Sequence, residues 1–125
     1  MMNIKVMSFG YKYGTPTDIN LLFDVRFLPN PHYDENLRPF CGTDKPVREF
    51  MEAHDETIRF CENVTSFVNF YINEMKNADR DVSVAFGCTG GKHRSVYMAE
   101  YLHMFLIKNG FENEILHRDL NGGEK

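Results

Sequence analysis

Residues 87–95 read Gly87-Cys88-Thr89-Gly90-Gly91-Lys92-His93-Arg94-Ser95. The apolar, β-branched run at residues 82–86 precedes this segment and predicts a buried strand. Apolar residues then recur at helical spacing from Val96 to Leu106, and Asn109-Gly110 indicates the end of that helix. The segment is therefore predicted to be a tight turn that leads from a strand into a helix.

The composition of this turn predicts a binding site for an anion, above all phosphate. Glycines let the backbone approach a ligand closely, and the first amides of a helix are free donors. The helix dipole adds partial positive charge, and Lys92, His93 and Arg94 add more. Three consecutive basic side chains repel one another and the dipole, so they cost stability unless an anion lies nearby. The alternative is a glycine-rich turn that joins a strand to a helix and binds nothing.

The length of 125 residues predicts one domain, residues 1–125, with a core at about 4–118 and a frayed tail at 119–125. The net charge of −4 argues against broad electrostatic binding of nucleic acid or of anionic membranes. No apolar run approaches the roughly twenty residues of a membrane span. The N-terminus does not look like a signal peptide, and three cysteines without paired spacing fit a reducing compartment. We therefore expect a cytoplasmic protein that contacts no membrane.

The pattern along the chain predicts strands that alternate with helices. The predicted strands are residues 4–9, 21–25, 82–86 and 112–116. A short helix is expected to start at Thr15, and a longer helical segment runs from Pro46 to about Asn77 with a break at His54-Asp55. The segment between Arg26 and about Lys45 is long and irregular. This order predicts a single α/β domain with an about four-stranded, largely parallel sheet and flanking helices.

Polar side chains follow each predicted strand, at the edge of the sheet where α/β proteins bind ligands. Lys12 follows the first strand, and His117 and Arg118 close the fourth. The second strand is followed by Asp24, Arg26, Asn30 and His32. Because the carboxyl ends of parallel strands share one edge, these clusters and the glycine turn are expected to form one pocket.

Known phosphate loops narrow the chemistry of the turn. The Walker pattern fails because the spacing from Gly87 to Lys92 is one residue short, and the dinucleotide pattern is absent, so no cofactor is predicted. No metal site is predicted either. Cys88 and Arg94 have the Cys-x5-Arg spacing of cysteine phosphatases, with Asp24 as a conceivable general acid. Gly87 stands where such enzymes carry histidine, and no segment clearly supplies the acid loop. Catalysis by Cys88 therefore stays an alternative.

Several longer motifs resemble the C-terminal domain of the RapZ family, the RNase adapter proteins. The resemblance runs from about Val6 to Arg118. The motifs are Phe9-Gly10-Tyr11-Lys12-Tyr13-Gly14, Phe23-Asp24-Val25-Arg26-Phe27-Leu28-Pro29-Asn30-Pro31-His32, Leu37-Arg38-Pro39, Gly42-Thr43-Asp44-Lys45-Pro46-Val47 and Gly87-Cys88-Thr89-Gly90-Gly91-Lys92-His93-Arg94-Ser95-Val96-Tyr97.

The resemblance implies a sheet like half of a phosphofructokinase, and a pocket for anions or phosphorylated metabolites, with amino-sugar phosphate as the family's theme. It also implies binding of a small regulatory RNA and its presentation to an endoribonuclease. It places Cys88, Thr89, Gly90, Gly91, His93 and Arg94 around the pocket, with Asp24, Arg26, Asn30 and His32 opposite. Full-length members carry an N-terminal kinase-like domain with a Walker loop, so a stand-alone version of the C-terminal domain is expected here, and a homodimer with it.

One departure from the family concerns RNA. RNA-binding members end in a basic tail, whereas the tail at residues 119–125 here is acidic or neutral as a whole. The leading hypothesis is therefore a non-catalytic binding or sensor domain for a phosphorylated small metabolite, with phosphate or sulfate as simpler ligands. An RNA-binding adapter and a cysteine-dependent phosphatase are the alternatives. The predicted ligand-binding residues are Asp24, Arg26, Asn30, His32, Cys88, Thr89, Gly90, Gly91, Lys92, His93, Arg94 and Ser95.

Overall fold

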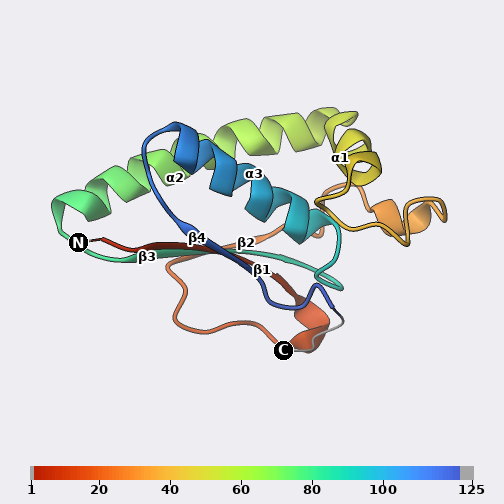
Figure 1. Ribbon diagram of the computed structural model, residues 1–125, viewed down its shortest axis with the longest axis horizontal. Helices are drawn as coiled ribbons and strands as arrows, with labels where there is room; N and C mark the ends of the chain where they lie inside the picture. The colour runs from red at the N-terminus through yellow and green to blue at the C-terminus, as the bar shows by residue number, and fades with distance from the viewer. Residues whose placement is uncertain (1, 122–125) are drawn as a thin grey trace.

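The computed structural model describes residues 2–121, and in this part of the chain three α-helices lie on one side of a four-stranded sheet (Figure 1). The strands are β1 (Ile4–Gly10), β2 (Leu21–Asp24), β3 (Val82–Cys88) and β4 (Glu114–His117). The helices are α1 (Lys45–Glu52), α2 (Asp55–Asn77) and α3 (Arg94–Lys108), with single 3-10 turns at η1 (Tyr11–Tyr13) and η2 (Pro31–Tyr33).

The strands lie in the order β2-β3-β1-β4, and every neighbouring pair is parallel. Val6 of β1 is in register with Val84 of β3 and with Ile115 of β4, and Phe23 of β2 is in register with Phe86. All four carboxyl ends therefore meet at one edge. The predicted α/β class with a parallel sheet is confirmed.

The strand order explains why the helices share one face. The connections from β2 to β3 and from β3 to β4 step in the same direction across the sheet, so crossovers of one hand place α2 and α3 on the same side. The connection from β1 to β2 steps the opposite way, and it passes across the other side of the sheet (Figure 1). The chain thus leaves the neighbouring strands β1 and β3 toward opposite faces of the sheet.

The core fills the space between the sheet and the two long helices. Alternate residues of β1 and β3 point toward the helices, and each helix contributes a stripe at intervals of four residues. Burial of these apolar side chains is the main stabilising contribution to the fold. They include Ile4, Val6, Val82, Val84, Phe86, Val64, Val68, Ile72, Met98, Leu102 and Leu106.

Two predictions about local structure are wrong. No helix starts at Thr15, and the segment ends instead at Asn20, which is bonded to β3: the Asn20 amide donates to the Ser83 carbonyl at 3.1 Å, and the Ser83 amide donates to Asn20 Oδ1 at 2.7 Å. The tail is not frayed at its start, since Asp119 is buried and accepts a hydrogen bond from the Gly10 amide. The rest of the predicted tail, residues 122–125, lies outside the described residues.

Candidate functional site

The candidate site lies where the carboxyl ends of β1 and β3 meet. The chain leaves β1 into η1 on one side of the sheet and leaves β3 toward α3 on the other. A crevice forms where two neighbouring strands send their connections to opposite faces, and ligands of open parallel sheets bind there. The topology thus selects the same edge that the polar clusters indicated.

A pocket of about 640 Å³ occupies this place. Small-molecule sites have volumes of roughly 300–1,000 Å³. The described residues that line it are Lys12, Tyr13, Asn30, His32, Tyr33, Arg38, Cys88, Thr89, Gly90, Lys92, His93, Arg94, Asp119 and Leu120. Of the twelve residues predicted for the site, the pocket brings together Asn30, His32, Cys88, Thr89, Gly90, Lys92, His93 and Arg94. Asp24, Arg26, Gly91 and Ser95 are not among its lining residues.

The glycines of the turn permit a close approach to β1. Gly91 has φ of +73°, and a Cβ atom there would lie 2.7 Å from the Gly10 nitrogen. On the other side of the turn, the Lys12 amide donates to the Thr89 carbonyl at 3.2 Å. Gly91 therefore shapes the pocket without lining it, because any side chain would push the turn away from the end of β1.

The lining is rich in positive charge. Lys12, Arg38, Lys92 and Arg94 all contribute to it. Among the described lining residues the one carboxylate is Asp119, and the Arg118 guanidinium already holds it at 2.7 Å. The pocket therefore carries excess positive charge at neutral pH, which favours an anionic ligand.

His93 contributes less charge than its position in the sequence suggested. The ring is buried, and burial lowers its pKa below the ordinary 6.5, although contact with the backbone of Phe40 partly opposes this. The imidazole is therefore neutral at pH 7. Its Nε2 atom is buried and has no hydrogen-bond partner among the described residues.

Arg94 begins α3, but its guanidinium is directed largely at the backbone. Nη1 donates to the carbonyl of Arg26 at 2.6 Å and to that of Leu28 at 3.3 Å, and only 5% of the residue is exposed. These bonds hold the segment after β2 against the start of α3, and that segment carries Asn30 and His32 into the pocket. Arg94 therefore positions the loop, and as a lining residue it also places a positive charge beside the pocket.

Asp119 is a site residue that the sequence did not predict. Its carboxylate accepts from the Gly10 amide at 2.8 Å and from Arg118, while Arg118 also donates to the Gly14 carbonyl at 2.6 Å. This network ties the end of β4 to the end of β1 on the rim of the pocket. A polar tail offers no local signal for such a contact, because its partner lies more than a hundred residues away in sequence.

Asp24 and Arg26 pair with each other instead of facing the pocket. The carboxylate and guanidinium are 2.7 Å apart, both side chains are about half exposed, and the guanidinium stacks 3.9 Å from the centre of the Tyr11 ring. Hydrogen bonds from the Arg26 side chain lower the pKa of Asp24 below its ordinary 3.8. Asp24 is therefore ionised at neutral pH and lies outside the pocket that Cys88 lines, which is the reverse of what a general acid requires.

Cys88 is the last residue of β3, and it lines the pocket although it is only 3% exposed. Its sulfur lies 3.1 Å from the hydroxyl oxygen of Ser95. Ser95 is completely buried behind it. Such burial fits a small residue packed between the strand and α3, so the geometry gives no separate support to a nucleophilic role.

The family model described as the RapZ C-terminal domain matches residues 2–121. The chain belongs to this family. The match covers all the described residues, including the glycine turn and Asp119, so the resemblance read from the motifs is confirmed.

Relatives with strong similarity share the same stretch. A "Nucleotide-binding protein" of Clostridium perfringens is 44% identical over 121 residues, which is 96% of this chain and 41% of the relative. A "Nucleotide-binding protein" of Vibrio cholerae is 41% identical over 114 residues, covering 90% of this chain and 40% of the relative. A "Nucleotide-binding protein" of Dechloromonas aromatica is 54% identical over 99 residues, covering 76% of this chain and 34% of the relative. This RapZ C-terminal domain thus spans about two fifths or less of the length of these relatives.

Two further observations concern what the described residues offer. No group of three or more His, Cys, Asp or Glu side chains within residues 2–121 is arranged to hold a metal ion. Nor does any helix in that range combine the length and the apolar character needed to cross a membrane.

Proposed function

We propose that this domain binds a phosphorylated small molecule in the pocket between β1 and β3, and that it does so without catalysis. The observation that carries the proposal is the charge of the lining: four basic side chains surround a cavity whose one described carboxylate is already paired. A phosphate dianion would neutralise this charge and accept hydrogen bonds from Lys12, Lys92 or the backbone of the turn.

The remainder of the lining suits the rest of a sugar phosphate. Asn30, His32 and Thr89 offer polar groups that can bind hydroxyls, and the rings of Tyr13 and Tyr33 flank the cavity. A sugar or amino-sugar phosphate therefore fits the lining better than inorganic phosphate alone, and we propose that the domain senses such a metabolite.

The relatives are named nucleotide-binding proteins, which makes a nucleotide the nearest variant of this ligand. The chain covers only 41% of the first of them, so their nucleotide need not bind in this part. RNA is the second candidate, and one observation favours it: Tyr33 is 82% exposed beside the basic side chains of Lys12 and Arg38, an arrangement on which a base can stack.

Isothermal titration calorimetry tests the proposal with glucosamine 6-phosphate, glucose 6-phosphate, AMP and inorganic phosphate. We expect a phosphate ester to bind, and Lys92→Gln to weaken it about tenfold because a charge-assisted hydrogen bond is lost. Arg80→Gln is the matched control, since Arg80 is exposed in the turn before β3, away from the pocket. Equal affinity in Lys92→Gln and wild type would refute the site, and a salt-dependent gel shift without ester binding would favour RNA.

A further inference from the structure

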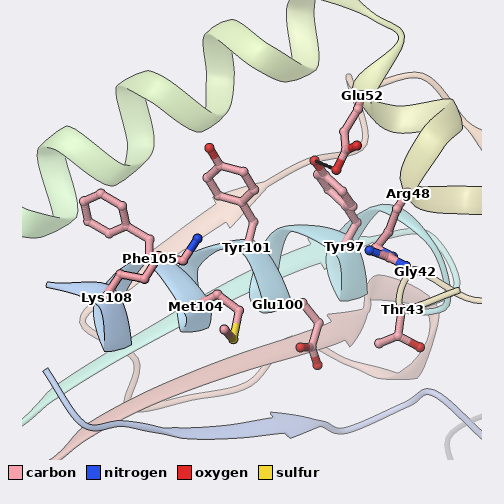
Figure 2. A pocket seen from close by; sticks show the side chains of 10 residues that line it. All are labelled: Gly42, Thr43, Arg48, Glu52, Tyr97, Glu100, Tyr101, Met104, Phe105 and Lys108. Atoms are coloured by element: carbon pink, nitrogen blue, oxygen red, sulfur yellow. Dashed lines mark hydrogen bonds between the residues drawn. The ribbon is translucent and has the colours of Figure 1, made fainter. Parts of the chain in front are cut away.

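A second cavity of about 500 Å³ lies along α3, next to α1 (Figure 2). It shares no lining residue with the pocket between β1 and β3, which we call the anion pocket. The two cavities are nevertheless close, because Gly42 lines the second one and its amide donates at 2.9 Å to the carbonyl of Lys92, which lines the first. We call this second cavity the α3 groove.

One wall of the α3 groove is an apolar stripe on the surface of α3. Tyr101 follows Tyr97 by four residues, Met104 and Phe105 follow Tyr101 by three and four, and Lys108 follows Met104 by four. These spacings place all five on one side of the helix (Figure 2). Tyr101 is 40% and Met104 47% exposed. Side chains of this size expose apolar surface that a ligand could cover.

The two carboxylates of the groove already have partners. Glu52 accepts a hydrogen bond from the Tyr97 hydroxyl at 3.2 Å (Figure 2), and burial raises the pKa of Tyr97, which keeps that hydroxyl protonated. Glu100 lies 2.7 Å from Nε2 of His117 on β4. The acidic side chains are therefore engaged with this chain itself.

The two basic side chains of the groove are not engaged. Within residues 2–121, neither the Arg48 guanidinium nor the Lys108 ammonium has a hydrogen-bond or ion-pair partner. Arg48 lies by Tyr97 at the α1 end, and Lys108 is the last residue of α3 (Figure 2). Tyr97 and Lys108 are about 16 Å apart along the helix at 1.5 Å per residue, so the groove is long and has a basic residue at each end.

We propose that the α3 groove is a second binding site, for a small amphipathic organic anion with a carboxylate on an aromatic or aliphatic body. The carboxylate would pair with Arg48, where the guanidinium can bind both oxygens. The apolar body would lie against Tyr101, Met104 and Phe105. The volume is within the range of small-molecule sites, and the inference does not depend on the function proposed for the anion pocket.

Nuclear magnetic resonance titration of the ¹⁵N-labelled chain with 4-phenylbutyrate tests this site. We expect saturable shifts of amide signals on α3 from Tyr97 to Lys108 and on α1 around Arg48. Arg48→Gln should raise the dissociation constant about tenfold, whereas the exposed Arg80→Gln should leave it unchanged. The neutral analogue 4-phenylbutanol should bind the wild type more weakly than the acid does. The acid and the alcohol should bind Arg48→Gln with equal affinity.

Three outcomes would overturn the proposal. Shifts confined to the glycine turn would assign the probe to the anion pocket. Equal affinity for the acid and the alcohol would show that Arg48 selects no charge. A chain that is dimeric in light scattering, and that turns monomeric in Met104→Glu, would show that a second copy covers the groove. Glucose 6-phosphate titrated into Arg48→Gln keeps the two proposals separate, because its binding should match the wild type.

Discussion

Replacing Arg94 with alanine separates a structural role from a ligand-binding role. The guanidinium donates to two backbone carbonyls, of Arg26 at 2.6 Å and of Leu28 at 3.3 Å, in a place that is almost closed to solvent. If Arg94 served the ligand alone, its removal would abolish phosphate binding and leave the fold as stable as before. The contacts predict a loss of stability as well.

The size of that loss follows from the two hydrogen bonds. A bond to a charged donor contributes about 1.5–3 kcal/mol, and the longer bond belongs at or below the low end of that range. The alanine variant leaves both carbonyls without this donor, so we expect a loss of about 3 kcal/mol in the free energy of unfolding. With a urea m-value of about 2 kcal/mol per molar, the unfolding midpoint should fall by roughly 1.5 M.

Urea unfolding followed by circular dichroism, without phosphate in the buffer, measures this change. Lys92→Ala is the control, because its ammonium donates to the Arg38 carbonyl in an exposed position and should contribute about 1 kcal/mol or less. A midpoint for Arg94→Ala within about 0.2 M of the wild type, at an unchanged m-value, would refute the structural role.

Two other perturbations follow from the same segment of the fold. In Gly42→Ala, the new Cβ would lie 2.4 Å from the His93 carbonyl oxygen and 2.5 Å from the Tyr97 nitrogen. The segment before α1 must therefore move, which should lower the free energy of unfolding by about 1–3 kcal/mol. A melting temperature equal to that of the wild type would contradict this contact. Burial lowers the pKa of His93 in the folded chain, so below pH 6.5 the unfolded chain binds more protons than the folded one. The contribution of the neutral His93 to stability is therefore complete above pH 6.5. It is lost as the pH falls toward the lowered pKa. Urea midpoints measured from neutral to mildly acidic pH should decline less in His93→Gln than in the wild type or in the exposed control His32→Gln, and parallel curves would contradict the buried imidazole.

The elements of the fold could be predicted because their signals are local. The apolar run at residues 82–86 and the helical spacing after Val96 are readable within a dozen residues, and both appear in the structure close to where they were expected. The failure at Thr15 has the same origin, since a cap followed by proline is a valid local signal. Long-range hydrogen bonds between Asn20 and Ser83 override it.

The site was only partly readable for a related reason. The glycine turn could be recognised from its residue types alone. The rule that ligands bind at the carboxyl ends of parallel strands predicts that Asn30 and His32 lie at the same place. Arg38 and Asp119, however, reach the pocket from an irregular loop and from the end of the chain. Neither segment has a periodic pattern, so no local rule gives their direction.

The sequence by itself determined that strands alternate with helices, that the sheet is parallel and that a glycine-rich, basic turn lies at its edge, because side-chain periodicity and backbone preference act over a few residues. Only the tertiary structure decided which charges face the pocket. Asp24 and Arg26 satisfy each other, Arg94 binds backbone carbonyls, and burial leaves His93 neutral. Each of these outcomes depends on burial and on which groups the fold brings within hydrogen-bond distance, and several of those partners lie far apart along the chain.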